Sequence, residues 1–144
     1  MDAPRQTLCP SAQPDWEGSR VIGVIDGTTE TPEVAYLTES QPVTDELLAL
    51  ARPVAPAEVF RFAATCKGGG CSHFSTEQHR CKLVEKIVRW APAVVEKLPA
   101  CTIRASCMWW DQEGKSACIR CPQVVTHHYE APEVIARAAD PAVA

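Results

Sequence analysis

Eight cysteines are the residues of this chain that could do chemistry, and seven of them lie between Cys66 and Cys121. Their spacing nearly repeats, as Cys66-x4-Cys71-x9-Cys81 and then Cys101-x5-Cys107-x10-Cys118. Cys121 and the distant Cys9 are each followed by a proline, so two triplets and two Cys-Pro pairs make two sets of four. Four thiolates are the usual ligand set of an iron–sulfur cluster or a structural zinc ion. The spacing therefore predicts metal-centre chemistry.

We assign the eight cysteines to two centres. The C-terminal quartet is Cys101, Cys107, Cys118 and Cys121, and it is compact because all four lie within 21 residues. The N-terminal quartet is Cys66, Cys71, Cys81 and Cys9, and it requires the N-terminal arm to fold back. The alternative for Cys9 is a buried free thiol. The N-terminal site would then have three thiolates and could carry a three-iron cluster, take His73 or His79 as a ligand, or leave an iron open to substrate.

Clusters of the [4Fe–4S] type are the cofactor that we expect, and zinc is the main alternative. Cys118-x2-Cys121 is a good zinc half-site, but zinc modules pair two close half-sites. The other intervals of four, five, nine and ten residues are looser. Disulfides rank third, because thiols stay reduced in the cytosol.

We expect a cytoplasmic location because of two features of the sequence. The N-terminus has neither the basic region nor the apolar segment of a secretory signal. No apolar run approaches the length that spans a bilayer, so we expect no association with a membrane.

The segment Cys118-Ile119-Arg120-Cys121-Pro122 resembles the CxxC and terminal Cys-Pro elements of bacterial ferredoxins. The full ferredoxin run CxxCxxCxxxCP is absent, so the ferredoxin fold does not carry over, and the CxxxCxxC signature of radical S-adenosylmethionine enzymes is absent too. The Cys9-Pro10 start, the glycine-rich loop after Cys66 and the stretch WWxQEGxxACxRCPQ resemble small bacterial eight-cysteine iron–sulfur proteins. That resemblance implies iron–sulfur ligation and no particular reaction.

Several residues beside the cysteines have both a structural and a functional interpretation. Residues 68–70, all glycine, either end a helix or let backbone amides approach a cluster, and their place between two cysteines favours the second. Met108, Trp109 and Trp110 are better explained as core than as an apolar wall that limits water at a cluster. His127 and His128 are better explained as exposed histidines than as ligands or proton donors.

The net charge of −4 is unevenly distributed. Residues 1–65 carry a balance of −6, residues 66–121 one of +4, and residues 122–144 one of −2. The basic excess in the cysteine-rich segment could offset anionic metal centres, form an unrelated surface, or bind an acidic partner. Nucleic acid is a poor candidate, because the chain is acidic overall and has no base-reading motif.

We expect an α+β, mostly helical fold in a single domain over residues 1–144. Residues 1–65 would form a β-hairpin and helices, residues 66–126 a cysteine-rich metal-binding body, and residues 127–144 a C-terminal tail or helix. The hairpin joins residues 20–25 to 33–38, and Gly23 marks a bulge or a close approach. Helices are predicted over residues 45–51 with Thr44 as N-cap, from Pro56 into Cys66, over 82–98 with an interruption at Pro92, and over 132–139.

The function that these patterns favour is a cytosolic iron–sulfur protein with two [4Fe–4S]-type centres, which transfers electrons to or from a redox partner protein. One alternative is a zinc-stabilised binding module whose basic segment contacts an acidic partner. A second alternative is an enzyme that uses an open cluster site, and it depends on whether Cys9 is a ligand. No pattern indicates an oligomeric state.

Overall fold

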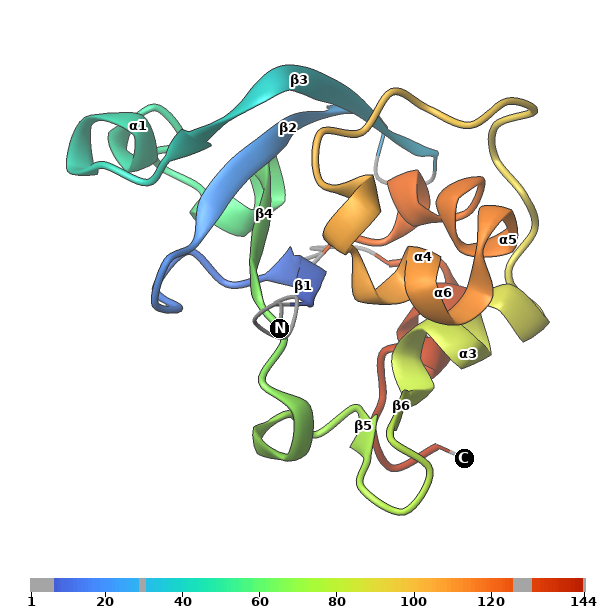
Figure 1. Ribbon diagram of the computed structural model, residues 1–144. Coiled ribbons are helices and arrows are strands. Elements are labelled where there is room, and N and C mark those ends of the chain that lie inside the picture. Colours follow the sequence, from blue (N-terminus) through green and yellow to red (C-terminus); the bar gives the residue numbers. More distant parts are fainter. Residues whose placement is uncertain (1–6, 29–30, 126–130, 144) are drawn as a thin grey trace.

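A four-stranded antiparallel sheet forms the centre of the computed structural model, which describes residues 7–28, 31–125 and 131–143 (Figure 1). Its strands are β1 (Leu8–Ala12), β2 (Arg20–Gly27), β3 (Pro32–Pro42) and β4 (Phe60–Thr65), in the order β1-β4-β2-β3. A small second sheet pairs β5 (Phe74–Ser75) with β6 (Arg80–Cys81). The helices are α1 (Asp45–Ala49), α2 (Pro56–Val59), α3 (Lys82–Trp90), α4 (Met108–Glu113), α5 (Lys115–Cys118) and α6 (Glu133–Ala138), with single 3₁₀ turns η1 (Gly68–Gly70), η2 (Arg104–Ser106) and η3 (Cys121–Gln123).

The expectation of a mostly helical fold is wrong. Helix accounts for 33% of the described residues and strand for 27%. The largest difference lies in residues 60–65, where the helix predicted from Pro56 ends at Val59 and the chain continues as the inner strand β4. A strand covered on both faces reads as a continuous apolar run, and periodicity alone does not distinguish such a run from a buried helix.

The local signals were more reliable. The hairpin is confirmed as β2 and β3, with a register shift between Val21 and Gly23. Thr44 caps α1, because its Oγ1 accepts a hydrogen bond of 3.1 Å from the Leu47 amide. Pro56 begins α2. The helix predicted over residues 82–98 ends at Trp90, since the residue before Pro92 is driven out of the helical conformation.

The sheet separates two apolar clusters, and β4 contributes to both by strand alternation. Phe60, Phe62 and Ala64 face the cluster that α1 and α2 cover. Ala63 faces the other cluster, which contains residues of α3 to α6 and the cysteines Cys107 and Cys121. In Figure 1 α1 and helices α3 to α6 accordingly lie on opposite sides of the sheet. The cysteine-rich body is therefore built directly onto one face of the sheet.

No helix within the described parts of the chain is long and apolar enough to cross a membrane.

Replacement of Gly23 by alanine should destabilise the protein, because β3 passes too close to leave room for a Cβ. A Cβ at this position would lie 2.6 Å from Cγ1 of Val34 and 3.1 Å from the carbonyl oxygen of Ala35. We expect Gly23→Ala to lower the free energy of unfolding by about 1–3 kcal/mol, the usual cost of overpacking. Urea unfolding measures this change, with Thr38→Ala on the exposed part of β3 as a control that should stay within about 0.5 kcal/mol. Equal midpoints for the two variants would contradict the prediction.

Candidate functional site

The four cysteines of the C-terminal quartet line one cavity of about 20 Å³. Cys101 lies in the loop before η2, Cys107 immediately precedes α4, Cys118 ends α5, and Cys121 begins η3. The sheet closes the other side of this cavity with Pro10 of β1, Ile22 of β2 and Tyr36 of β3. Gly23 pairs with Tyr36 in the hairpin, so the close approach at Gly23 helps to place Tyr36 on the cavity.

The four cysteines of the N-terminal quartet line a second cavity of about 20 Å³. Cys9 reaches it because β1 pairs with β4, with Cys9 opposite Ala64. The amide of Cys66, the residue after β4, donates a hydrogen bond of 2.7 Å to the carbonyl of Thr7, which holds the two ends of the quartet side by side. Pro10 is compatible with this pairing because β1 is an edge strand. Sheet pairing is thus what folds the N-terminal arm back.

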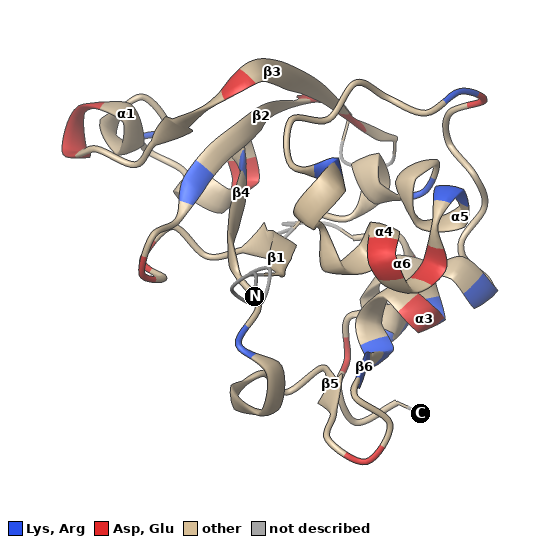
Figure 2. Ribbon diagram, viewed as in Figure 1, with Lys and Arg blue, Asp and Glu red and all other residues tan. Residues whose placement is uncertain are grey.

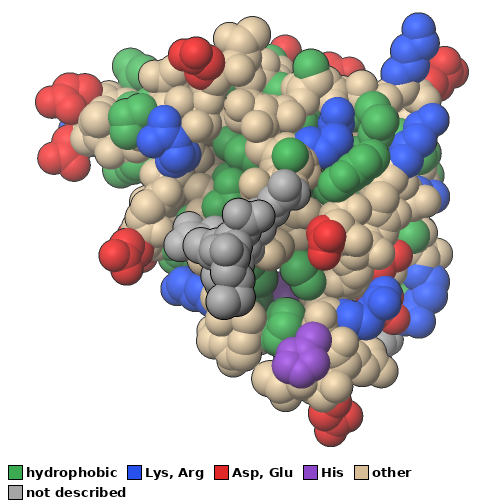
Figure 3. Space-filling model, in the orientation of Figure 1, with side chains coloured by type: hydrophobic (Ala, Val, Ile, Leu, Met, Phe, Trp, Pro, Cys, Tyr) green, Lys and Arg blue, Asp and Glu red, His purple; other side chains and the backbone are tan. Residues whose placement is uncertain are grey.

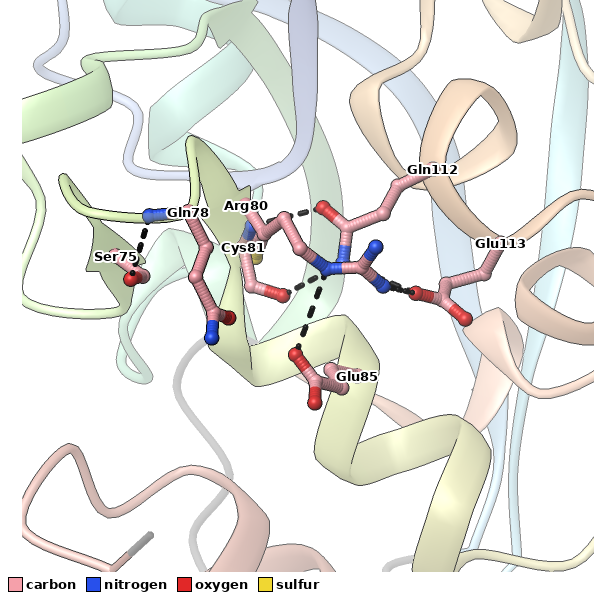
Figure 4. A network of polar contacts seen from close by, with 7 residues as sticks. All are labelled: Ser75, Gln78, Arg80, Cys81, Glu85, Gln112 and Glu113. Atoms are coloured by element: carbon pink, nitrogen blue, oxygen red, sulfur yellow. Dashed lines mark hydrogen bonds and ion pairs between the residues drawn. The ribbon is translucent and has the colours of Figure 1, made fainter.

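The Gln112 side chain of α4 holds Cys81 in place (Figure 4). The Cys81 amide donates to Oε1 of Gln112 at 2.8 Å, and Nε2 of Gln112 donates to the Cys81 carbonyl at 2.9 Å. Next to it, Arg80 forms an ion pair with Glu113 at 2.7 Å and a longer one with Glu85 at 3.7 Å. Because Cys107 is the N-cap residue of α4, one short helix positions a cysteine of each quartet.

Burial makes most of these thiols hard to ionise. Desolvation raises the pKa of Cys9 and of Cys107 to about 12, and it also raises the pKa values of Cys81, Cys101 and Cys118. Backbone amides oppose this effect at two helix starts, those of Leu83 and Val84 at Cys81 and those of Trp109 and Trp110 at Cys107. A bound cation would deprotonate such thiols, since ligation requires the thiolate.

Arg61 is a site residue that the sequence analysis missed. It lies in β4 and is completely buried. Its guanidinium donates to the carbonyls of Pro10 at 2.5 Å and Cys121 at 2.8 Å, and to the Cys121 sulfur at 3.0 Å. Burial lowers the pKa of Arg61, but the neighbouring sulfur of Cys121 and the Tyr36 hydroxyl outweigh this and raise it overall. A lone arginine inside the apolar run FRFAAT was the available signal, because arginine is almost never fully buried unless it is paired.

The basic excess of residues 66–121 is used mainly away from the cysteines. Arg80 pairs with glutamates, Lys86 donates to the carbonyls of Asp140 and Val143, and Arg120 donates to that of Ala91. Lys67 and Arg104 are the basic residues of this segment that line the two cavities. Figure 2 shows basic and acidic positions mixed along α3 to α5, and Figure 3 shows both kinds scattered among hydrophobic side chains.

The aromatic and apolar residues beside the cysteines line the two cavities and also belong to the core. Trp109 is 1% exposed, belongs to the main apolar cluster and lines both cavities. Met108 and Phe74 line the N-terminal cavity. The glycine loop forms η1, and the amides of Gly70 and Cys71 donate to the carbonyls of Lys67 and Gly68. Those two amides are therefore occupied within the turn.

Two histidines lie in the described part of the chain. His73 lines a larger hollow together with Cys9, Cys71 and Cys81 of the N-terminal quartet, and His79 packs edge-to-face with Phe74. His127 and His128 lie outside the described residues.

All eight cysteines carry free thiols, although the fold gathers them in two sets of four. Among the described residues, no three His, Cys, Asp or Glu side chains are grouped so that they could hold a single metal ion. No protein-family model, curated protein or solved structure matches this chain. The geometry of the two quartets is therefore the basis for a functional proposal.

Loss of the Gln112 side chain should loosen Cys81 selectively. Gln112→Ala removes the acceptor of the Cys81 amide, and a net hydrogen bond of about 1.4 kcal/mol corresponds to roughly tenfold faster amide exchange. Hydrogen–deuterium exchange with mass spectrometry measures this. Gln78→Ala on the same hairpin is the matched control, because Gln78 bonds Ser75 through its backbone amide and keeps that contact. An unchanged exchange rate of the Cys81 amide in Gln112→Ala would show that the Gln112 side chain does not hold Cys81 in place.

Alkylation of the metal-free protein should depend steeply on pH at Cys9 and Cys107. Because only the thiolate reacts and both pKa values are about 12, the thiolate fraction rises with pH throughout the range from about 8 to 10. We expect iodoacetamide rates at both residues to rise about tenfold per pH unit there, whereas a free thiol with a pKa of about 8.5 levels off. The urea-unfolded chain is the control, because the alkylation rates of its exposed thiols should level off in this pH range. A plateau near pH 9 in the folded protein would contradict the burial effect.

Proposed function

We propose that this protein holds two [4Fe–4S] clusters, one in each cysteine quartet, and acts in the cytoplasm as an electron carrier for a redox partner protein. The observation that carries the proposal is that two separate cavities are each lined by four cysteines. Four thiolates complete the ligand set of a [4Fe–4S] cluster.

The surroundings of the quartets support a polynuclear cluster over zinc. Structural zinc requires four ligands about 2.0–2.3 Å from a single point. A cubane cluster instead binds each thiolate through a different iron, so the sulfurs surround a larger inorganic core. The cavities also have walls of Trp109, Met108 and Ile22, and apolar walls limit the water that would otherwise reach a cluster.

Electron transfer is favoured over substrate chemistry because Cys9 lines the same cavity as Cys66, Cys71 and Cys81. With four thiolates at each cluster, every iron that the protein holds has a protein ligand. The enzyme hypothesis depended on a missing fourth thiolate, so the placement of Cys9 supports a carrier.

Anaerobic purification tests the proposal. We expect a brown protein with broad visible absorption and about eight irons per chain, because each [4Fe–4S] cluster contains four. Single replacements should then divide the iron between the quartets. Cys66→Ser and Cys107→Ser should each lose about half of the iron and leave the spectrum of one cluster.

Ser116→Ala is the control for these replacements, since Ser116 lies beside Cys118 and contacts Arg120 through its backbone carbonyl alone. It should keep all of the iron. A colourless protein with stoichiometric zinc would replace this proposal with the zinc-stabilised binding module. A Cys9→Ala variant with unchanged iron and spectrum would remove Cys9 from the ligand set.

A further inference from the structure

The two quartets differ in the positive charge beside their sulfurs. At the C-terminal quartet the buried guanidinium of Arg61 donates to the Cys121 sulfur at 3.0 Å. Arg104 lines the same cavity as Cys118, and its guanidinium lies 5.6 Å from the centre of the Trp110 ring. At the N-terminal quartet the cation lining the cavity is Lys67, an exposed residue whose Nζ lies 4.3 Å from the centre of the Trp16 ring. Two guanidinium groups therefore face one site and a solvated ammonium faces the other.

This difference affects the ease with which each centre is reduced. Reduction adds one negative charge to a cluster, and a hydrogen bond or a nearby cation stabilises the more negative state. A charge-assisted hydrogen bond is about twice as strong as a neutral one. Arg61 acts within the interior, where charges are weakly screened, whereas water and salt screen the exposed ammonium of Lys67.

The two sites also differ in burial. Cys107 and Cys121 of the C-terminal quartet are buried, whereas all four cysteines of the N-terminal quartet are partly exposed. Three of those four, Cys9, Cys71 and Cys81, also line a larger hollow of about 360 Å³. An external donor therefore comes closest to the N-terminal quartet.

Trp109 lies between the two sites. Its buried indole lines both cavities, and the Arg61 guanidinium lies 5.7 Å from its ring centre. The neighbours of Trp109 in sequence divide between the sites, with Cys107 at the C-terminal cavity and Met108 at the N-terminal one. Likewise Cys9 lines the N-terminal cavity and Pro10 the C-terminal one. One layer of side chains therefore separates the two sites.

We propose that Arg61 and Arg104 are positioning residues that make the C-terminal quartet the higher-potential centre, so that electrons enter at the N-terminal quartet and pass across Trp109. This inference rests on the proposed function. A one-electron donor protein reduces the N-terminal centre by one electron. That electron then moves to the C-terminal centre, so the first centre is reoxidised and the second is reduced. No bond forms or breaks in either step.

Redox titration of the intact protein under anaerobic conditions, followed by electron paramagnetic resonance, tests the inference. The wild-type protein should show two separate one-electron steps. Arg104→Gln should reduce the equilibrium constant of the higher-potential reduction about tenfold, which lowers its potential by about 59 mV for one electron. The potential of the lower step should stay unchanged. Lys67→Gln should lower the potential of the lower step and leave that of the higher step unchanged. Arg89→Gln is the matched control, since Arg89 is exposed beside Trp90 and lines neither cavity, and both steps should stay in place.

Arg61→Lys is the second variant, because it keeps the buried charge but loses the forked donor geometry. It should lower the potential of the same step as Arg104→Gln. Iron analysis and circular dichroism verify that the variant is folded and loaded. Two loaded centres that titrate together would overturn the inference while leaving the proposed function intact. A shift of the lower step in Arg104→Gln, or of the higher step in Lys67→Gln, would also overturn it. A wild-type protein without iron would overturn the proposed function and this inference with it.

Discussion

The buried guanidinium of Arg61 is the interaction that joins the sheet to the cysteine-rich body. A charged group in a protein interior is costly unless its donors are used. Arg61 meets that condition by donating to the Pro10 and Cys121 carbonyls and to the Cys121 sulfur, with its plane near Trp109. These contacts connect β4 with β1, η3 and α4 at a single point. Sheet and cysteine-rich body therefore depend on one another.

Side chains alternate between the two faces of a strand, so neighbouring residues of β4 and of β1 contact different parts of the protein. On β4 the side chains of Phe60 and Phe62 build one apolar cluster, while Arg61 between them is directed to the cysteine side. On β1 the neighbours Cys9 and Pro10 line different cavities. The two quartets consequently lie close together without sharing a cysteine, and Trp109 fills the space between them.

Signals that act over a few residues were sufficient for part of the fold. Thr44 and Pro56 mark the starts of α1 and α2 through local backbone chemistry, and both helices begin there. The hairpin turn was expected between residues 25 and 33, and the strands extend further, to Gly27 and Pro32. The strand β4 was mistaken for helix, because a strand buried on both faces has no period-2 polarity. The strand β1 was not foreseen, since it is five residues long and contains a proline. Both errors produced the incorrect expectation of a mostly helical fold.

The sequence by itself determined the number of cysteines, their local spacing and the compactness of the C-terminal quartet, because 21 residues of chain keep those four thiols near one another. Only the tertiary structure decided where Cys9 lies and which cation meets a sulfur. The reason is that both depend on pairings between distant segments, Cys9 with Ala64 across two strands and Arg61 with Cys121 across the domain. Such pairings depend on how whole faces of the sheet and the helices are buried against each other, and a short stretch of sequence does not predict that.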